Sequence, residues 1–298
     1  MSEASKEEIP ILKKSDWELD FYSRPIIEAD GKKRWELLIA SSEYFKGKES
    51  FKWEKTCPAS EVNSIWLEKA LKEALIEARR QGWESPLKLR CWRTSMKTMI
   101  KKAALKVDIE VVPSRRTFSL IDWLRQREKD FYPTQKGYMN GPIAPPPTQI
   151  VNQPEPLPET VRGDAWTFAL LPLQTLLEAD EWPIEFSGLL PIKETYDLST
   201  PIPGLRLFSK SRALALAGWL GGLEPVRLVL EGNQLLLEAG QDDRWLVTDM
   251  TNDSSKEAHK ILMNSREKAG GIQFISIQTT PDERKFTGFW MLRDMPGY

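Results

Sequence analysis

The sequence predicts an α+β protein of two domains joined by a proline-rich linker. Alternating apolar residues mark short strands, and apolar stripes with a helical period mark the helices between them. A length of 298 residues suits two domains of ordinary size. Seven prolines fall between residues 137 and 158. This extended stretch predicts a first domain over residues 1–136, a linker over 137–162 and a second domain over 163–298.

The first domain opens with three predicted strands. Trp17, Leu19 and Phe21 alternate with polar residues, and residues 34–40 repeat this alternation. Asp30-Gly31 lies between the two runs, which is a strong local signal for a β-hairpin. Residues 51–56 form a third alternating run.

A helix follows the third strand. Apolar residues recur at helical spacing from Val62 to Ala78. Ser60 is the predicted N-cap and Gly82 the predicted end.

Two further strand–helix pairs complete this domain. Residues 87–92 and 107–113 are the predicted strands, with a helix between them that Thr94 or Ser95 caps. Ser119, with Asp122 three positions later, predicts the start of a third helix. The order β-β-β-α-β-α-β-α is that of a ribonuclease H-like sheet, which is an analogy at the level of the fold.

The second domain is predicted as a mixed α/β sheet domain. Residues 166–173 form a continuous apolar strand, and a proline-interrupted region follows to Pro203. Ser209 is the predicted cap of a short helix that ends at Gly221-Gly222. Ser254 and Glu257 have the spacing of a capping box for a second helix. The predicted strands after Pro203 are residues 226–231, 234–239, 244–249, 272–279 and 285–294.

Composition argues against several classes of site. Cys57 and Cys91 are the only cysteines and His259 is the only histidine, so zinc sites, disulfide frameworks and most His-based triads are not expected. The usual glycine-rich nucleotide-binding motifs are absent from the sequence, and neither a cofactor nor a metal is expected. No apolar run reaches the roughly 18 to 20 residues of a membrane span. The acidic N-terminus resembles neither a signal nor a transit peptide, so a cytoplasmic location is expected.

Charge is divided unevenly along the chain. Residues 1–133 carry 27 Lys and Arg against 22 Asp and Glu, whereas residues 134–298 carry 15 against 21. The segment 87–118 is the most basic part of the first half. A basic segment within a folded domain indicates a surface for an anionic polymer.

This basic segment supplies the candidate RNA-binding residues. Lys97 and Lys101 fall on one helical face, after a strand that ends in Arg90, Trp92 and Arg93. Lysine and arginine neutralise phosphates, and an exposed aromatic ring stacks on an unpaired base. The alternative is an ordinary solvated helix face. The candidates in this segment are Arg90, Trp92, Arg93, Lys97, Lys101, Arg115 and Arg116.

A ribonuclease H-like sheet also raises the possibility of a metal-dependent nuclease. Asp20 on the first strand and Glu73 or Glu77 on the first helix are its candidate carboxylates. The fourth strand offers no acid and is basic. The alternative role for Asp20 is an ion pair with Arg24 or Arg90, and no catalytic residue is assigned.

Three stretches resemble the Tab-two-like proteins of cyanobacteria and chloroplasts. They are WELDFYSRPI at residues 17–26, GKKRWELLI at 31–39 and FTGFWMLRD at 286–294. The resemblance implies an RNA-binding protein of the cyanobacterial cytoplasm, and not an enzyme. It further implies that the RNA is an A/U-rich leader and that the protein supports translation and biogenesis of photosystem proteins, with translation or assembly proteins as possible partners.

The same resemblance implies a second group of RNA-binding residues. The family has a Trp-Leu-Leu motif associated with RNA binding, which falls here on Trp290, Met291 and Leu292. Methionine at the middle position departs from the motif but preserves side-chain volume. The alternative functions are a protein-binding scaffold or photosystem assembly factor with incidental RNA contact, and the nuclease above.

Overall fold

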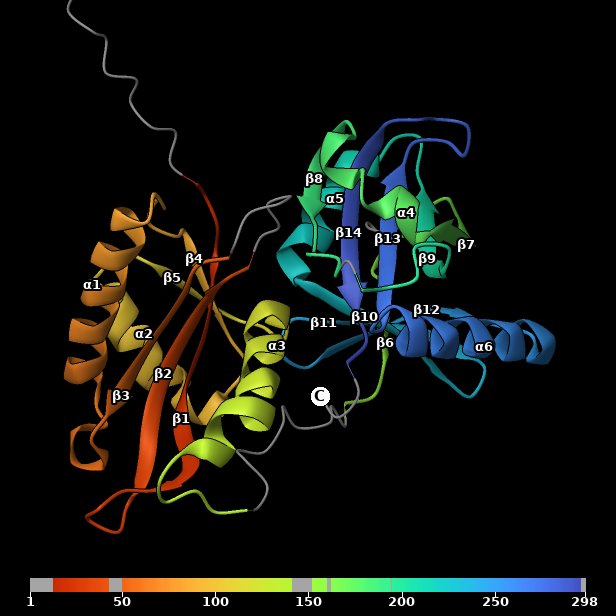
Figure 1. Cartoon of the computed structure of the whole chain (residues 1–298). Helices are drawn as coiled ribbons and strands as arrows, with labels where there is room; N and C mark the ends of the chain where they lie inside the picture. Colours follow the sequence, from red (N-terminus) through yellow and green to blue (C-terminus); the bar gives the residue numbers. More distant parts are fainter. Residues whose placement is uncertain (1–12, 43–49, 141–151, 160–161, 194, 296–298) are drawn as a thin grey trace, which may run out of the picture. The chain divides into compact units, whose positions relative to one another are not determined.

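The computed structural model describes residues 13–42, 50–140, 152–159, 162–193 and 195–295, which form two compact units (Figure 1). Among these residues, the first unit holds 13–42, 50–112 and 119–140. The second unit holds 113–118 and the residues from 152 onward. The segment Pro113–Phe118 therefore belongs to the second unit, although the chain on both sides of it belongs to the first.

The first unit is a five-stranded sheet with helices on both faces. Its strands run in the order β3-β2-β1-β4-β5. β1 pairs antiparallel with β2 and parallel with β4, and β2 pairs antiparallel with β3. This confirms the β-β-β-α-β-α-β-α order and gives the connectivity of a ribonuclease H-like sheet. The elements are β1 Trp17–Ile27, β2 Lys33–Ser41, β3 Lys52–Cys57, α1 Ser64–Arg80, β4 Lys88–Cys91, α2 Lys97–Leu105, β5 Glu110–Pro113 and α3 Phe118–Gln126.

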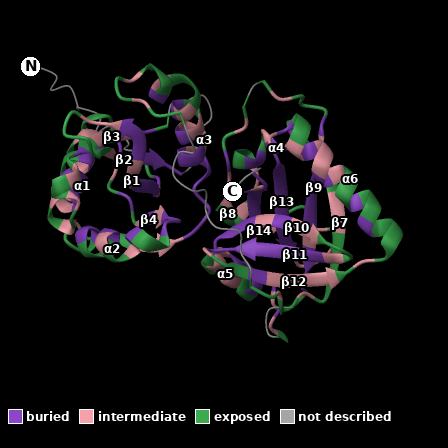
Figure 2. Ribbon diagram, turned by 90° about the horizontal axis from the view of Figure 1, so that it is seen from below, coloured by how far each residue is buried: buried purple, intermediate pink, exposed green. Residues whose placement is uncertain are grey.

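Both faces of this sheet are buried, but by different chemistry (Figure 2). On the apolar face, Phe21 stacks on Trp66 of α1 with the ring centroids 5.4 Å apart. On the opposite face, Glu18 accepts a hydrogen bond of 2.7 Å from the backbone N–H of Leu120 in α3. The alternation in β1 thus places apolar side chains toward α1 and charged ones toward α3.

The helix starts differ from the predicted caps. Asn63, and not Ser60, caps α1, and its side chain accepts from the backbone N–H groups of Ile65 and Trp66 at 2.9 Å each. α3 begins at Phe118, so Ser119 lies inside the helix. Several capping residue types lie close together at each site, which is why the sequence indicates each helix but not its first residue.

The second unit contains two sheets. The first runs in the order β7-β9-β13-β14-β8 and the second in the order β10-β11-β12-β6. The hairpin of β13 and β14 and the three-stranded meander of β10, β11 and β12 confirm the predictions. The strands are β6 Glu155–Pro156, β7 Ala165–Pro172, β8 Ile184–Gly188, β9 Pro201–Phe208, β10 Pro225–Glu231, β11 Gln234–Ala239, β12 Asp243–Asp249, β13 Ile272–Gln278 and β14 Phe286–Arg293.

Strand β9 is absent from the sequence prediction because it begins with two prolines. Pro201 and Pro203 pair only with β7, whereas pairing with β13 starts at Gly204. The prolines therefore lie where β9 has a single neighbour, which is the position in a sheet that tolerates a missing N–H. The region that the prolines interrupt thus leads directly into a strand that has a neighbour on each side from Gly204 onward.

The helices of the second unit are α4 Leu173–Leu176, α5 Ala213–Leu223 and α6 Asn252–Lys268. α5 packs into a core that both sheets share, with Leu205 and Ile275 from one sheet and Leu235 from the other. Thr251, and not Ser254, caps α6, and α5 starts four residues after the predicted cap Ser209.

The predicted linker lies partly outside the described residues, which omit 141–151 and 160–161. Within it, Glu155 and Pro156 form β6 and pair with Trp245 and Leu246 of β12. The domain limits at residues 136 and 163 remain predictions. Across the described part of the chain, no helix combines the length and the apolar character that crossing a membrane requires.

Candidate nucleic-acid interface

Helix α2 and its C-cap residue Lys106 carry four lysines on the outside of the first unit. Ile100, Ala103 and Ala104 are buried beneath it, while Lys101, Lys102 and Lys106 are exposed and Lys97 is half-buried. The sequence from Thr94 to Val107 contains no acidic residue. Within the part of the chain that the structure describes, these lysines form no ion pair. We call Lys97, Lys101, Lys102 and Lys106 the α2 lysines.

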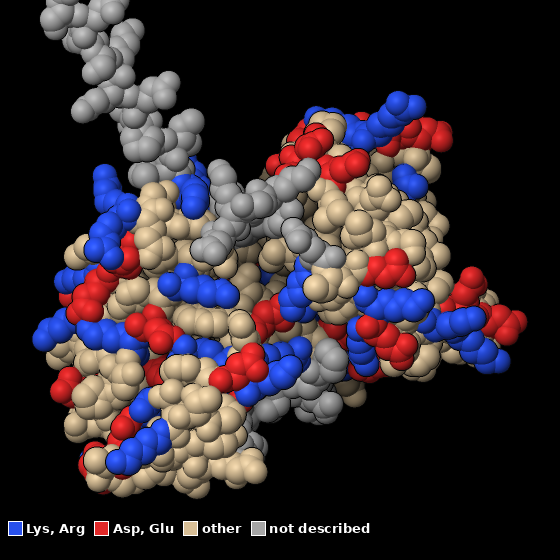
Figure 3. All heavy atoms as spheres, viewed as in Figure 1, with Lys and Arg blue, Asp and Glu red and all other residues tan. Residues whose placement is uncertain are grey.

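Basic residues of α1 extend this surface. The ammonium of Lys72 lies 2.6 Å from the carboxylate of the half-buried Glu68 and holds the pKa of that carboxyl below its usual range. Lys106 and Lys69 contribute to the same lowering of the pKa, which shows that the end of α2 lies near this part of α1. Over the face drawn in Figure 3, which includes α1, Lys and Arg are interspersed with Asp and Glu.

Arg90 and Arg93 lie beside α2 but are engaged within the unit. Arg90 pairs with Asp16 at 3.1 Å and donates to the hydroxyl of Ser42 at 3.2 Å. Arg93 pairs with Asp20 and packs over the Tyr22 ring, 4.1 Å from its centroid. Both guanidinium groups thus have partners inside the protein.

Asp20 is a buried ion-pair partner of two arginines. Its carboxylate accepts from Arg24 at 2.9 Å and from Arg93 at 2.5 Å. Burial favours the neutral acid, but Arg93 and Arg24 outweigh it and hold the pKa of Asp20 below its usual value of 3.8. The predicted pairing with Arg24 is confirmed, whereas Arg90 pairs with Asp16 instead.

The other carboxylates of the nuclease alternative are also paired with cations. Lys55 binds Glu73 at 2.5 Å, and Arg80 binds Glu77 at 3.0 Å. A carboxylate already bound to a cationic side chain is a poor ligand for a second cation. The arrangement around Asp20 is therefore that of a structural ion cluster.

Arg115 and Arg116 are buried in the second unit. Arg115 pairs with Glu238 of β11 at 3.0 Å. Arg116 donates hydrogen bonds to three backbone carbonyls, those of Gly188 at 2.7 Å, Pro225 at 2.8 Å and Met291 at 2.9 Å. These two candidates therefore anchor the segment Pro113–Phe118 among the strands of the second unit.

Trp290, Met291 and Leu292 lie in the interior of β14 and are 4%, 1% and 0% exposed. Trp290 and Leu292 belong to the core cluster around α5. In this conformation the three side chains reach no solvent-facing surface on which a base could stack. The three side chains contribute to packing. The backbone carbonyl of Met291 accepts a hydrogen bond from Arg116.

The exposed tryptophan is one that sequence reasoning missed. All twelve tryptophans lie in the described residues, and eleven are buried or half-buried, including Trp92 at 4% exposure. Trp166 on β7 is 41% exposed. Its apolar neighbours in residues 166–173 predict a buried strand, so no local signal marks it as a surface residue. Trp166 is therefore the exposed indole among the twelve tryptophans of the described chain.

The chain is similar to known proteins over nearly its whole length. Residues 16–127 match the family described as RNA-binding protein Tab2/Atab2 N terminal, and residues 145–293 match RNA-binding protein Tab2/Atab2, C-terminal domain. A chloroplastic TAB2 homolog of Arabidopsis thaliana is 33% identical, over 94% of this chain and 75% of that protein. One of Zea mays is 32% identical, over 94% of this chain and 72% of that protein. No solved structure matches the chain.

Proposed function

Because the chain belongs to the Tab2/Atab2 family of RNA-binding proteins, we propose that it binds single-stranded, A/U-rich RNA and that the α2 lysines contact the phosphate backbone. The absence of ion pairs at these lysines within the described residues is the observation that supports this site. A lysine without an internal partner exchanges only water and counterions for a phosphate. Release of those counterions is the main source of affinity that does not depend on sequence.

The other predicted residues of the first unit have a supporting role in this proposal. Arg90 and Arg93 hold the end of β4 against β1 through Asp16 and Asp20. Trp92, which lies between the two arginines in the sequence, is buried in the core. These contacts fix the strand that leads into α2, and so they position Lys97 and Lys101.

Replacing all four α2 lysines by alanine tests the proposal. We expect weaker binding to every single-stranded RNA, because phosphate contacts do not distinguish bases. We also expect the slope of log affinity against log salt to flatten by roughly 0.7 for each phosphate that the variant no longer neutralises. Fluorescence anisotropy across a salt series measures both quantities.

The matched control replaces Lys32, Lys33, Lys129 and Lys136, which are exposed lysines elsewhere on the same unit. Both variants lose the same charge. An equal loss of affinity in the two would show that only net charge matters, and it would contradict a site on α2. Unchanged affinity and salt slope in the α2 variant would contradict it as well.

The resemblance in sequence extends the proposal to particular messages. We propose that the bound RNAs include leaders of messages for photosystem I subunits and that binding supports their translation in the cytoplasm. Crosslinking the protein to RNA in the living cell, followed by sequencing, identifies the bound messages. Enrichment of A/U-rich leaders is the expected result, and an even spread over all transcripts is the opposing one.

A further inference from the structure

Strand β7 forms one edge of the five-stranded sheet in the second unit. It is eight residues long, and it pairs with β9 in one continuous register from Ala165 to Pro172. Among the described residues, the other side of β7 has no neighbouring strand. An edge strand of this kind presents a row of backbone N–H and C=O groups to which another strand can pair.

β7 is the described edge strand that contains no charged residue. The three sheets have two edges each, and the other five edge strands each carry at least one charge. These charges include Glu54 in β3, Glu110 in β5, Glu155 in β6, Glu185 in β8 and Arg227 in β10. Charged side chains at an edge discourage pairing with another chain. β7 lacks this protection, since the chain is uncharged from Ala165 to Leu177.

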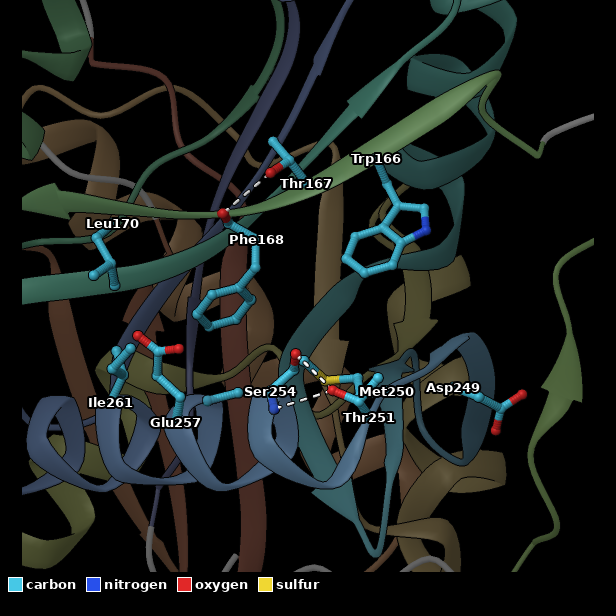
Figure 4. A pocket seen from close by; sticks show the side chains of 11 residues that line it. Trp166, Thr167, Phe168, Leu170, Asp249, Met250, Thr251, Ser254, Glu257 and Ile261 are labelled. Atoms are coloured by element: carbon cyan, nitrogen blue, oxygen red, sulfur yellow. Dashed lines mark hydrogen bonds between the residues drawn. The ribbon is translucent and has the colours of Figure 1, made fainter.

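Three large apolar side chains project from one face of β7. Trp166, Phe168 and Leu170 alternate along the strand and point toward α6, as Figure 4 shows. They line a cavity of about 460 Å³ between β7 and α6, so α6 does not cover them completely. Trp166 is 41% exposed and Leu170 is 45% exposed. A second strand beside β7 would remove part of this apolar surface from water, which is favourable.

The prolines of β9 show which backbone groups of β7 point outward. Pro201 and Pro203 lie opposite even-numbered residues of β7, and a proline has no N–H to donate. The even-numbered residues therefore form the non-hydrogen-bonded pairs of this antiparallel ladder. The N–H and C=O groups of Trp166, Phe168 and Leu170 consequently point away from β9, toward the open side of the strand.

We infer that two copies of this chain pair through β7, with the two strands antiparallel and related by a twofold axis at Phe168. In this register, Trp166 of each copy lies opposite Leu170 of the other copy, and an aromatic ring opposite an aliphatic side chain is a favourable pair. The outward backbone groups hydrogen-bond across the axis, and the two five-stranded sheets join into one. This pairing does not depend on RNA binding.

A second copy suits this edge because β7 is complementary to itself. A twofold axis brings each strand against an identical strand, so a net charge on the strand would face the same charge. Like charges on opposite strands are destabilising. The absence of charge from β7 removes this repulsion, and it also leaves nothing that would attract a charged strand of a different protein.

Sedimentation of the full chain over a dilution series tests this inference. The unaltered protein should dissociate from dimer to monomer on dilution. Leu170→Lys alone and Trp166→Glu alone should each raise the concentration of half-dissociation by about tenfold or more, because a charge then lies opposite an apolar side chain. Circular dichroism establishes that each variant is folded.

Combining two substitutions tests the register. In Trp166→Glu/Leu170→Lys, each new carboxylate lies opposite a new ammonium of the other copy, and dimerisation should recover most of the loss. The two positions are about 13 Å apart along one strand, which is too far for an ion pair within one copy. Trp166→Lys/Leu170→Lys is the matched variant. It places like charges opposite each other and should remain monomeric where the oppositely charged variant is dimeric.

Phe186→Lys is the control at the other edge of the same sheet. Phe186 on β8 is an aromatic residue with 38% exposure, and this variant should dimerise as the unaltered protein does. Amide hydrogen exchange supplies a measurement that needs no substitution. The N–H groups of Trp166, Phe168 and Leu170 should exchange more slowly in the dimer than in the dilute monomer, whereas that of Ala169 should be protected in both.

Three results would overturn the inference. The first is a chain that stays monomeric at every concentration. The second is a dimer that Leu170→Lys leaves unchanged, or that Phe186→Lys weakens to the same extent, because its interface then lies elsewhere. The third is equal behaviour of the two double variants, since opposite and like charges must differ if Trp166 faces Leu170 of the second copy.

Discussion

Asp20 illustrates how one residue type acquires a role from its surroundings. Metal-dependent nucleases with a ribonuclease H-like sheet carry a metal-binding carboxylate on the first strand, which is where Asp20 lies. Here, two guanidinium groups bind it in the interior, and Arg24 connects it to Glu36 at 3.3 Å. Tyr132 donates to the same Glu36 at 2.7 Å. The result is a cluster of paired charges beneath α3, in place of an open site.

We expect Asp20→Asn to destabilise the first unit by about 3 to 5 kcal/mol at about pH 7, because it removes the buried anion that Arg24 and Arg93 share. The lowered pKa means that Asp20 contributes this stability above its unfolded pKa of 3.8 and loses it as the pH falls through the lower folded value. The difference between the two proteins should therefore shrink toward about pH 3. Urea denaturation at several pH values measures it.

Asp130→Asn is the control for this substitution, because Asp130 is exposed in the same unit. Its effect should lie within about 0.5 kcal/mol at all pH values. A stability difference for Asp20→Asn that stays constant on acidification would contradict the role of its charge.

The sequence determines residue types but not which side chains reach the surface. The basic run around α2 could be predicted because its lysines are local in sequence. Arg115 and Arg116 belong to the same run, yet their partners Glu238 and Met291 are far away in the chain. Trp92 stands among basic residues and Trp166 in an apolar run, yet tertiary packing buries Trp92 and leaves Trp166 exposed. Candidate sites that depend on exposure could not be predicted.

At the scale of elements, most helices and strands could be predicted from periodicity, and the exceptions have physical causes. β9 begins with prolines, and β8 is a short edge strand. Both were absent from the predicted elements. β6 is only two residues long and falls in the predicted linker, whereas the other strands of the second unit follow the apolar pattern closely, because turn signals such as Gly232-Asn233 separate them.

The glycine that opens the pairing of β9 with β13 should be intolerant of a side chain. A Cβ atom on Gly204 would lie 2.3 Å from the ring of Phe274, which is itself buried. Gly204→Ala should therefore cost about 1 to 3 kcal/mol through overpacking. Thermal or urea unfolding of the variant measures this cost.

Gly218→Ala on α5 is its counterpart. A Cβ atom at Gly218 meets nothing within 4 Å, and the residue lies in a helix. The substitution should be neutral or should stabilise the protein by up to about 1 kcal/mol. If both substitutions had the same effect, the close approach at Phe274 would not explain the need for glycine.

At the scale of the whole molecule, the two units are not two consecutive stretches of the chain. Residues Pro113–Phe118 leave the first unit and contribute Arg115 and Arg116 to the second. A boundary drawn from the proline-rich stretch alone separates these residues from their partners. A linker signal in the sequence marks where the chain is extended, but it does not show which unit a short segment joins.

Arg116→Ala should destabilise the second unit by about 3 kcal/mol or more, because three backbone carbonyls, two of them in buried hydrogen bonds, lose their donor. Arg116→Lys should recover only part of this loss, since an ammonium lacks the planar fork of a guanidinium. Arg284→Ala removes an exposed arginine from the same unit and should be close to neutral. Equal unfolding midpoints for Arg116→Ala and Arg284→Ala would contradict the anchoring role.

The hydrogen bond from Arg116 to Met291 joins residues that are 175 positions apart. During synthesis the chain leaves the ribosome from its N-terminus, so Arg116 emerges long before the carbonyl that it will bind. Until β14 has been translated, Arg116 cannot form this hydrogen bond, and the arginines of the segment Pro113–Phe118 remain in contact with water. Folding of the second unit is therefore completed only once β14 has been synthesised, whereas the strands of the first unit are all made earlier.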